Sequence, residues 1–273
     1  MRTNHSPYEK IMYPHSHHQT DRPILDVSHV TVRYNGLAAL DDITFHLHQG
    51  ERIAVVGPNG AGKSTLFKAI AGVLQPNTGE VNIFGSLPRR HVCIAYIPQR
   101  SQVDWNFPVS VADVVMMGRS AKLGPFNFPR KKDWEHVQRA LETVELSDLA
   151  AHQIGQLSGG QQQRMFIARA LAQEAELMLM DEPLSGLDTP AQEGLLSLLD
   201  TLRSQNATVM VATHDLDQAA RHFDRIMLLN HRIIAFDVPQ NVMQTDHLLQ
   251  AYGGRLKIDP GGTMLVDDCC PPD

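Results

Sequence analysis

The sequence predicts an α/β fold in which a mostly parallel sheet is joined to a group of antiparallel strands. Three short runs in the second half, LMLM, ATVMVAT and IMLLN, are apolar throughout and are separated by helical patterns. Such runs are typical of parallel strands that helices cover on both faces. From Ile24 onward, β-branched and polar residues alternate instead, as in VSHVTVRY and ITFHLH. This alternation favours antiparallel strands.

Composition predicts one large domain with a subdomain in a reducing compartment. The length of 273 residues is ample for a sizeable core. The net charge of −6, with scattered Lys and Arg, argues against a nucleic-acid partner. Three cysteines, Cys93, Cys269 and Cys270, cannot all pair. No apolar run approaches the roughly 18 residues of a membrane helix, and no signal-peptide core is present. We expect a cytosolic protein that works at a membrane only through a partner.

Both ends of the chain are expected to be flexible. Residues 1–22 are polar and contain four histidines, His5, His15, His17 and His18. These histidines could buffer metal ions, but we favour an ordinary solvated tail. Residues 256–273 contain prolines and adjacent glycines without periodicity, and predict a second flexible segment.

The elements between the two ends can be predicted in order. ERIAVVG is a strand that runs into a glycine-rich loop, and STLFKAIAGVL is the helix that follows. A middle section marked by Pro and Gly contains two helical segments, 109–118 and 131–146. After Gln173 the pattern becomes strand–helix–strand, with helices over AQEGLLSLLDTLRSQ and LDQAARHF. These helices separate the apolar runs named above.

The glycine-rich loop matches the pattern G-x-x-x-x-G-K-[ST] in its required place between a strand and a helix. Its glycines let backbone N–H groups wrap a phosphate chain. Lys63 would place a positive charge at the β- and γ-phosphates, and the Ser64 hydroxyl would bind Mg²⁺. A chance glycine-rich turn is improbable in this setting. We expect the nucleotide-binding residues to be Gly57, Pro58, Asn59, Gly60, Ala61, Gly62, Lys63, Ser64 and Thr65.

The apolar run LMLMDE ends in two carboxylates, Asp181 and Glu182. At the carboxyl end of a parallel strand, Asp181 would face the same crevice as the phosphate loop and hold Mg²⁺. Glu182 is placed to take a proton from an attacking water. The alternative is an ordinary solvated strand end, which the neighbouring phosphate loop makes less attractive.

The stretch Leu157-Ser158-Gly159-Gly160-Gln161 opens a segment with helical periodicity. Two interpretations are open from these residues alone. The glycines and the free N–H groups of a helix start could bind an anion. Ser158 could equally be an ordinary N-cap.

Three single residues follow apolar strands or lie within one. His214, after VMVAT, could reach a γ-phosphate and orient a water, although a lone histidine is more often structural. Gln99, after AYIP, could touch Mg²⁺ or water. Tyr34 could stack on an adenine ring or pack in the core.

Taken together, these residues resemble an ATP-binding cassette (ABC) protein, the motor subunit of ABC transporters. The motifs run in the family's order from about Ile24 to Phe236. Tyr34 matches the adenine-stacking position, GPNGAGKS the Walker A loop, Gln99 the Q-loop and LSGGQ the signature motif. LMLMDE matches Walker B with the catalytic glutamate, SGLD the D-loop with Asp188, and His214 the switch histidine.

The resemblance implies a cassette over residues 23–255 with a helical subdomain at about 100–168. It implies ATP and Mg²⁺ as cofactors, with Glu182 and His214 catalytic and Ser64, Gln99 and Asp181 at the metal. Two copies would pack head to tail, so that each ATP lies between the Walker motifs of one chain and the signature motif of the other. The signature residues concerned are Ser158, Gly159, Gly160 and Gln161. Asp188 would lie at the dimer contact.

The segment RSQVDWNFPVSV followed by DVVMMGR resembles the manganese, zinc and iron branch of binding-protein-dependent metal importers. The resemblance implies a separate membrane permease, an extracytoplasmic metal-binding protein and a location at the cytoplasmic face of the cell membrane. Manganese is the first choice, with zinc or iron as alternatives. We expect Trp105 and Phe107 to divide between core packing and permease docking. One departure is Ala235-Phe236-Asp237, where many relatives have a glycine in a turn.

A different class of function is also open. Soluble ABC ATPases act in translation or DNA repair. They usually carry two cassettes in one chain or a long coiled-coil insertion, and neither is found in this sequence.

Overall fold

The computed structural model describes residues 23–85, 87, 93–123, 127–204 and 206–253. It also describes the backbone of two short strands, β10 (Leu256–Ile258) and β11 (Met264–Val266), which pair antiparallel. The N-terminal tail lies outside the described residues, so its expected flexibility stays a prediction. The flexibility expected for residues 256–273 also stays a prediction, and β10 and β11 lie within that segment. Within the described part of the chain, no helix is long and apolar enough to cross a membrane.

Three antiparallel strands form the β-subdomain, in the order β2-β1-β4. They are β1 (Leu25–Tyr34), β2 (Leu37–Leu47) and β4 (Thr78–Ile83). Along β1, buried residues such as Val27 and Val30 alternate for most of its length with more exposed ones. One face of this small sheet is therefore core and the other solvated, as the alternation predicted.

The central sheet has the order β5-β6-β7-β3-β8-β9. Its strands are β5 (Ile94–Ile97), β6 (Leu177–Asp181), β7 (Thr208–Thr213), β3 (Arg52–Val56), β8 (Arg225–Asn230) and β9 (Arg232–Asp237). All neighbours pair parallel except β8 and β9, which form an antiparallel edge. Every residue of β3, β6 and β7 is buried. The prediction of a parallel sheet from continuous apolar runs is confirmed.

Helices pack against strands of the central sheet, from β6 to the edge strand β9. They are α1 (Lys63–Ile70), α6 (Thr189–Ser204), α7 (Leu216–His222), α8 (Pro239–Val242) and α9 (Thr245–Tyr252). Two apolar clusters fill the core, one of which contains the buried faces of the β-subdomain and α1. The other extends from the central sheet into the helices of the middle section. Cys93 is a free thiol, and burial raises its pKa to about 12, so it is protonated at neutral pH.

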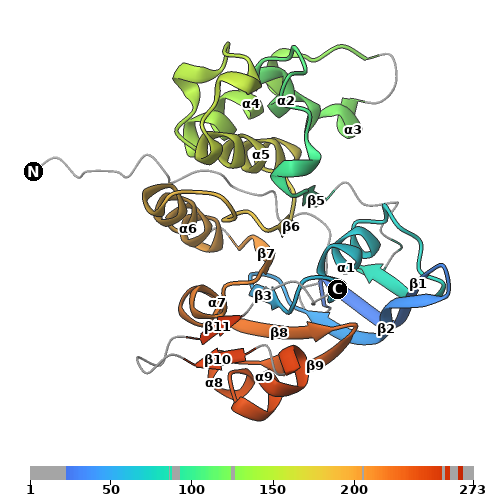
Figure 1. Cartoon of the computed structure of the whole chain (residues 1–273). Coiled ribbons are helices and arrows are strands. Elements are labelled where there is room, and N and C mark those ends of the chain that lie inside the picture. Colours follow the sequence, from blue (N-terminus) through green and yellow to red (C-terminus); the bar gives the residue numbers. More distant parts are fainter. Residues whose placement is uncertain are drawn as a thin grey trace, which may run out of the picture.

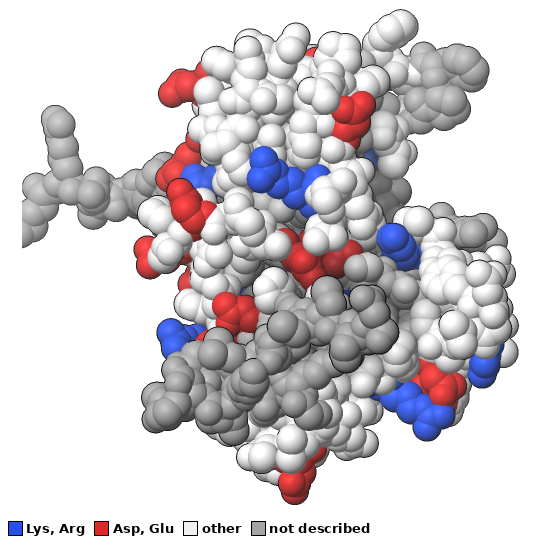
Figure 2. Space-filling model, in the orientation of Figure 1, with Lys and Arg blue, Asp and Glu red and all other residues white. Residues whose placement is uncertain are grey.

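The middle section forms a separate helical lobe above the sheet in Figure 1. It contains α2 (Val111–Met117), α3 (Ser120–Leu123), α4 (Lys131–Thr143) and α5 (Gly159–Gln173). Short 3-10 turns lie at Arg100–Gln102, Ser147–Leu149 and Ile154–Gln156. The last helix continues five residues past the boundary expected at 168. On the face drawn in Figure 2, acidic side chains gather in the hollow between this lobe and the sheet.

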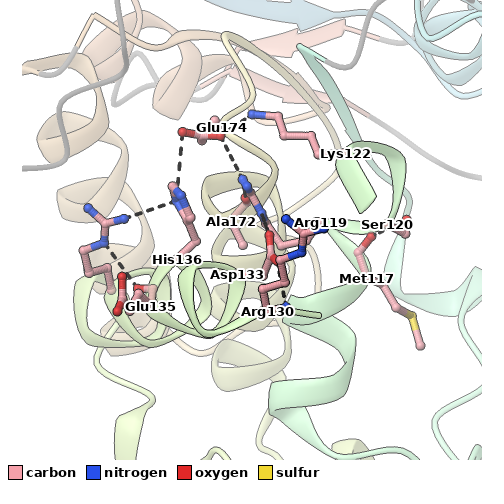
Figure 3. A network of polar contacts seen from close by, with 11 residues as sticks. Met117, Arg119, Ser120, Lys122, Arg130, Asp133, Glu135, His136, Ala172 and Glu174 are labelled. Carbon is pink, nitrogen blue, oxygen red and sulfur yellow. Dashed lines mark hydrogen bonds and ion pairs between the residues drawn. The ribbon is translucent and has the colours of Figure 1, made fainter. Parts of the chain in front are cut away.

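A buried polar network braces the lobe (Figure 3). Arg119 is 5% exposed and donates to Asp133 Oδ1 at 3.2 Å, to Ala172 O at 2.9 Å and to Glu174 Oε2 at 2.8 Å. Lys122 also binds Glu174. Burial raises the pKa of Glu174, but the hydrogen bonds from Lys122 and Arg119 outweigh it and hold that pKa below its ordinary value. The network therefore ties the segment from the end of α2 through α3 to α4 and to the end of α5.

Candidate active site

The phosphate loop connects β3 to α1 and encloses the Lys63 side chain. Lys63 is 6% exposed, and its Nζ donates to Gly57 O at 2.7 Å and to Pro58 O at 3.1 Å. Gly62, at φ 98°, precedes the helix and leaves its first turn without a side-chain cap among the described residues. First-turn N–H groups have no partner within a helix. They can therefore bind an anion, next to an ammonium group already held in place.

Two glycines of this loop are required by packing as well as by ligand approach. A Cβ at Gly57 would lie 2.0 Å from Leu229 O, and one at Gly62 would lie 2.4 Å from Ala39 O. These contacts come from backbone atoms of β8 and β2, which cannot move aside easily. The sequence predicts only the reason that concerns the ligand. The packing reason depends on residues far away in the chain.

Asp181 ends β6 at the carboxyl edge of the parallel sheet and is 2% exposed. Its Oδ2 accepts a long hydrogen bond of 3.4 Å from Tyr96 OH, which comes from the neighbouring strand β5. Burial, and then the charge of Asp181, raise the pKa of Tyr96 well above its ordinary value, so the phenol stays a donor. Tyr96 was missed at the sequence level because it lies in a short strand without a motif.

Asp181 and Ser64 suit a magnesium ion. Asp181 is nearly fully buried, and the side-chain donor that it has among the described residues is a neutral phenol at 3.4 Å, so its carboxylate favours a nearby cation. Mg²⁺ usually takes one or two carboxylates together with substrate phosphates. Ser64 lies in the first turn of α1, which contacts β6. When bound, the ion would neutralise charge on the phosphates. Among the described residues, no group of three or more His, Cys, Asp and Glu forms a separate metal cluster.

Glu182 is joined to Gln99. Gln99 Nε2 donates to Glu182 Oε2 at 3.0 Å, although the two residues are 83 positions apart. Glu182 has a left-handed backbone, with φ 49°, and its N–H donates to Ala212 O at 3.0 Å. The structure therefore brings Gln99 to the candidate base, whereas the sequence reasoning placed it at Mg²⁺ or water.

His214 is exposed and follows directly after β7. It shares a small pocket with Glu182, which lies at the end of the adjacent strand β6. The pocket is lined by Glu182, Leu184, Ser185, Gly186, Gln192, Thr213, His214, Asp215 and Gln218. The two residues predicted to act on an attacking water thus face one cavity.

The stretch Leu157–Gln161 begins helix α5 with a complete capping box. Ser158 Oγ accepts from Gln161 N at 3.4 Å, and Gln161 Oε1 accepts from Ser158 N at 2.9 Å. The N-cap interpretation is therefore confirmed. Ser158 is nevertheless exposed, so capping does not bury it.

The signature glycines pack against their own chain. A Cβ at Gly159 would lie 3.1 Å from both Arg100 Nη1 and Leu187 Cδ2, and one at Gly160 would lie 3.0 Å from Ala191 Cβ. Asp188, between these neighbours, caps α6 by accepting from Ala191 N at 3.0 Å. The signature turn and the D-loop thus lie side by side in one chain.

Tyr34 lies at the end of β1 and is 48% exposed. Its partner across the hairpin, Leu37, is 78% exposed. The alternative of a core tyrosine is therefore wrong. The ring remains available for stacking.

A phosphate loop, a strand-end acid pair and a histidine after the neighbouring strand, all on a parallel sheet, define a P-loop ATPase. The chain belongs to the ABC transporter family, whose family model matches residues 40–185. Members hydrolyse ATP to power transport, so this chain is an ATPase.

Several relatives of this chain are named for metal transport systems. The chain is 44% identical to the manganese transport system ATP-binding protein MntB of Bacillus subtilis, covering 85% of this chain and 93% of that protein. It is also 44% identical to the zinc transport system ATP-binding protein TroB of Treponema pallidum, with 85% and 88% covered. Identity to the chelated iron transport system membrane protein YfeB of Yersinia pestis is 42%, with 94% and 88% covered.

A solved structure agrees with the fold. The chain superposes on cbiO1 of Clostridium perfringens, part of the ABC transporter complex cbiONQ, with a TM-score of 0.71 and 27% identity. The match covers 84% of this chain and 93% of that chain. The predicted fold class, a cassette with an antiparallel β-subdomain and a helical subdomain, is confirmed.

Proposed function

We propose that this ATPase energises import of a divalent metal cation, manganese first, through a separate membrane permease. Relatives of equal identity are named for manganese and for zinc, so zinc is the nearest alternative and iron the next. The observation that carries the proposal is a groove beside the candidate active site, described below. The soluble, non-transport ABC ATPase remains the alternative from another class.

The groove is lined by Gln99, Arg100, Ser101, Val103, Trp105, Glu182 and Ser185. It therefore contains the candidate catalytic base and the start of the VDWNFP segment together. Trp105 packs edge-on against Phe166 at 5.8 Å between ring centroids, whereas Phe107 is 56% exposed. The Trp105 ring is partly buried and packs against the core, and the exposed Phe107 ring is the one that we propose meets a partner. A permease segment docked here would contact the residue that holds Glu182.

Each residue in the proposed site has a distinct role. Lys63 and the N–H groups of the loop Gly57–Thr65 bind the phosphates, and Tyr34 stacks on adenine. Asp181 and Ser64 hold Mg²⁺, with Gln99 as a further ligand if it leaves Glu182. Glu182 accepts a proton from the attacking water, and His214 orients that water toward the γ-phosphate.

The proposed working unit contains two cassettes, head to tail. Ser158, Gly159, Gly160 and Gln161 of one copy complete the ATP site of the other, with Asp188 at the contact. ATP then favours the closed dimer and hydrolysis removes that preference. In the cell the complex would sit at the cytoplasmic face of the membrane, with a permease and an extracytoplasmic metal-binding protein as partners.

The substitution Glu182→Gln tests this assignment. The amide keeps the size of the side chain but cannot accept the proton, so turnover falls about a hundredfold or more while ATP still binds. A closed, ATP-bound dimer accumulates, as gel filtration with ATP would show. The matched control is Glu193→Gln on the exposed face of α6. Normal hydrolysis by Glu182→Gln would remove Glu182 from the catalytic role.

The cargo is tested in cells. A strain that lacks this chain should lose cellular manganese more than zinc or iron, measured by elemental analysis. Loss of zinc or iron instead would change the cargo within the same architecture. Co-purification with ribosomes or DNA, in place of a membrane protein, would favour the soluble class.

A further inference from the structure

Two glutamine side chains connect the D-loop to the turn that carries His214. Gln192, in α6, donates through Nε2 to Leu184 O at 3.3 Å and to Leu187 O at 3.1 Å. Gln218, in α7, donates through Nε2 to Gln192 Oε1 at 2.9 Å. The bridge therefore spans two helices and ends on the backbone of the segment between Glu182 and Asp188.

The contacts of Gln192 with Leu184 O and Leu187 O determine which end of each amide donates. Two carbonyl oxygens can accept only from the NH₂ end of the Gln192 amide, so its oxygen must point toward Gln218. Gln218 must then present its own NH₂ end to that oxygen. The orientation of both amides thus follows from the D-loop backbone.

The bridge also lines the pocket shared by Glu182 and His214. Gln218 N donates to Asp215 Oδ1 at 2.8 Å, so Gln218 belongs to the first turn of the helix that begins directly after His214. Its Oε1 atom is buried and has no hydrogen-bond partner within the described part of the chain. A buried acceptor without a partner costs free energy, and the contact of Gln218 Nε2 with Gln192 Oε1 keeps the amide in this orientation in spite of that cost.

We infer that Gln192 and Gln218 are positioning residues that keep the D-loop and the His214 turn at a fixed separation across this pocket. The inference rests on the proposed function, because it assumes that Glu182, His214 and Asp188 act in hydrolysis. The role assigned to the two glutamines is indirect, through the backbone turns that they contact. The pair acts by holding two backbone turns, so losing it should slow turnover without weakening nucleotide binding.

The sharpest variant is Gln192→Glu. It keeps the side-chain size but turns a carboxylate oxygen toward the carbonyl oxygens of Leu184 and Leu187, so the bridge to the D-loop is lost. The expected result is a fall of about tenfold in kcat, with the Kd for ATP and the unfolding temperature nearly unchanged. Gln138→Glu is the control, since the Gln138 amide is also a donor, at 3.0 Å to Glu142 Oε1, but on the exposed face of α4.

A second variant keeps the inference testable if the first one unfolds. Gln218→Leu removes the other half of the bridge without adding charge, and should lower kcat by a similar factor. Because the two residues act as one unit, the double variant should be no slower than the worse single variant. Multiplying effects would contradict a shared bridge.

The dimer gives a readout that a purely structural role would not move. In the Glu182→Gln background, Gln192→Glu should reduce the ATP-dependent dimer fraction while ATP binding per chain stays constant. If the wild-type chain is active and both glutamine variants keep its kcat and dimer fraction, this inference alone is overturned. A wild-type chain without ATPase activity would overturn the proposed function and this inference together.

Discussion

The phosphate loop and the signature turn are both glycine-containing helix starts, yet the molecule builds them in opposite ways. At the phosphate loop, α1 has no side-chain cap within the described residues, and a buried lysine is held by loop carbonyls. At the signature turn, Ser158 and Gln161 cap α5 completely. The first site offers its first-turn N–H groups to an anion without a competing side chain, whereas at the second a serine hydroxyl already accepts from one of them, Gln161 N.

The glycines of the two helix starts also have different neighbours. Gly57 and Gly62 lie against the backbone carbonyls of Leu229 and Ala39. Gly159 lies against the ends of the Arg100 and Leu187 side chains, which can move. The loop is thus formed by the fold of its own chain. We expect the signature turn to gain its function only when a second copy arrives.

The strongest way to break this comparison is Gly57→Ala. A methyl group 2.0 Å from Leu229 O forces the loop or β8 to move, at a cost of about 3 kcal/mol. The displaced loop should lose ATP affinity by more than about a hundredfold, measured by titration, while denaturant unfolding reports the stability. Gly253→Ala is a control outside the loop, because a Cβ there has open space and the cost comes from its positive φ of 62°. A Gly57→Ala chain that bound ATP normally would contradict the packing argument.

Ser158→Arg should leave ATP binding intact but reduce turnover by about a hundredfold, because a long cation would block the approach of the second copy. Removing the cap also costs about 1 kcal/mol. Ser110→Arg is the matched control, since Ser110 is the capping-box residue of α2 in the same lobe. Equal loss of turnover in both variants would assign the effect to the cap, and not to the shared site.

Gly159→Ala should lower kcat while changing the free energy of unfolding little. Its new methyl group meets flexible side-chain ends, so the free energy of unfolding should change by less than about 1 kcal/mol. If the glycine serves close approach of nucleotide in the dimer, kcat should fall about tenfold. Normal kcat would mean that Gly159 serves packing alone.

As pH falls, the helical lobe should lose stability before the phosphate loop does. Burial and then Arg119 lower the pKa of His136, so the unfolded chain binds that proton more tightly, and stability falls as pH drops below about 6.5. The lowered pKa of Glu174 means that its ion pairs are lost at a still lower pH, below about 4.5. The unfolding temperature should fall by a few degrees between pH 7 and 5. His136→Gln should flatten that part of the curve, and His152→Gln, at an exposed position, should not.

The contiguous motifs were predictable because neighbouring residues form them. The phosphate loop, the Asp181–Glu182 pair and the Ser158 cap all depend on short segments whose strand or helix context can be predicted. The Gln99–Glu182 bond, Tyr96 beside Asp181 and the Gln192–Gln218 bridge were not predicted. Each joins residues from different strands or helices, and no local pattern in the sequence records which side chains the sheet order brings together.

The network around Arg119 has a mechanical consequence. If the helices of the lobe shifted against one another, a displacement at one side of the lobe would not reach the other side. A rigid lobe transmits that displacement. Because Arg119 binds Asp133, Ala172 and Glu174 at once, the helices of the lobe resist shear against one another. A push near Phe107 should therefore arrive at Ser158 as rotation of the whole lobe.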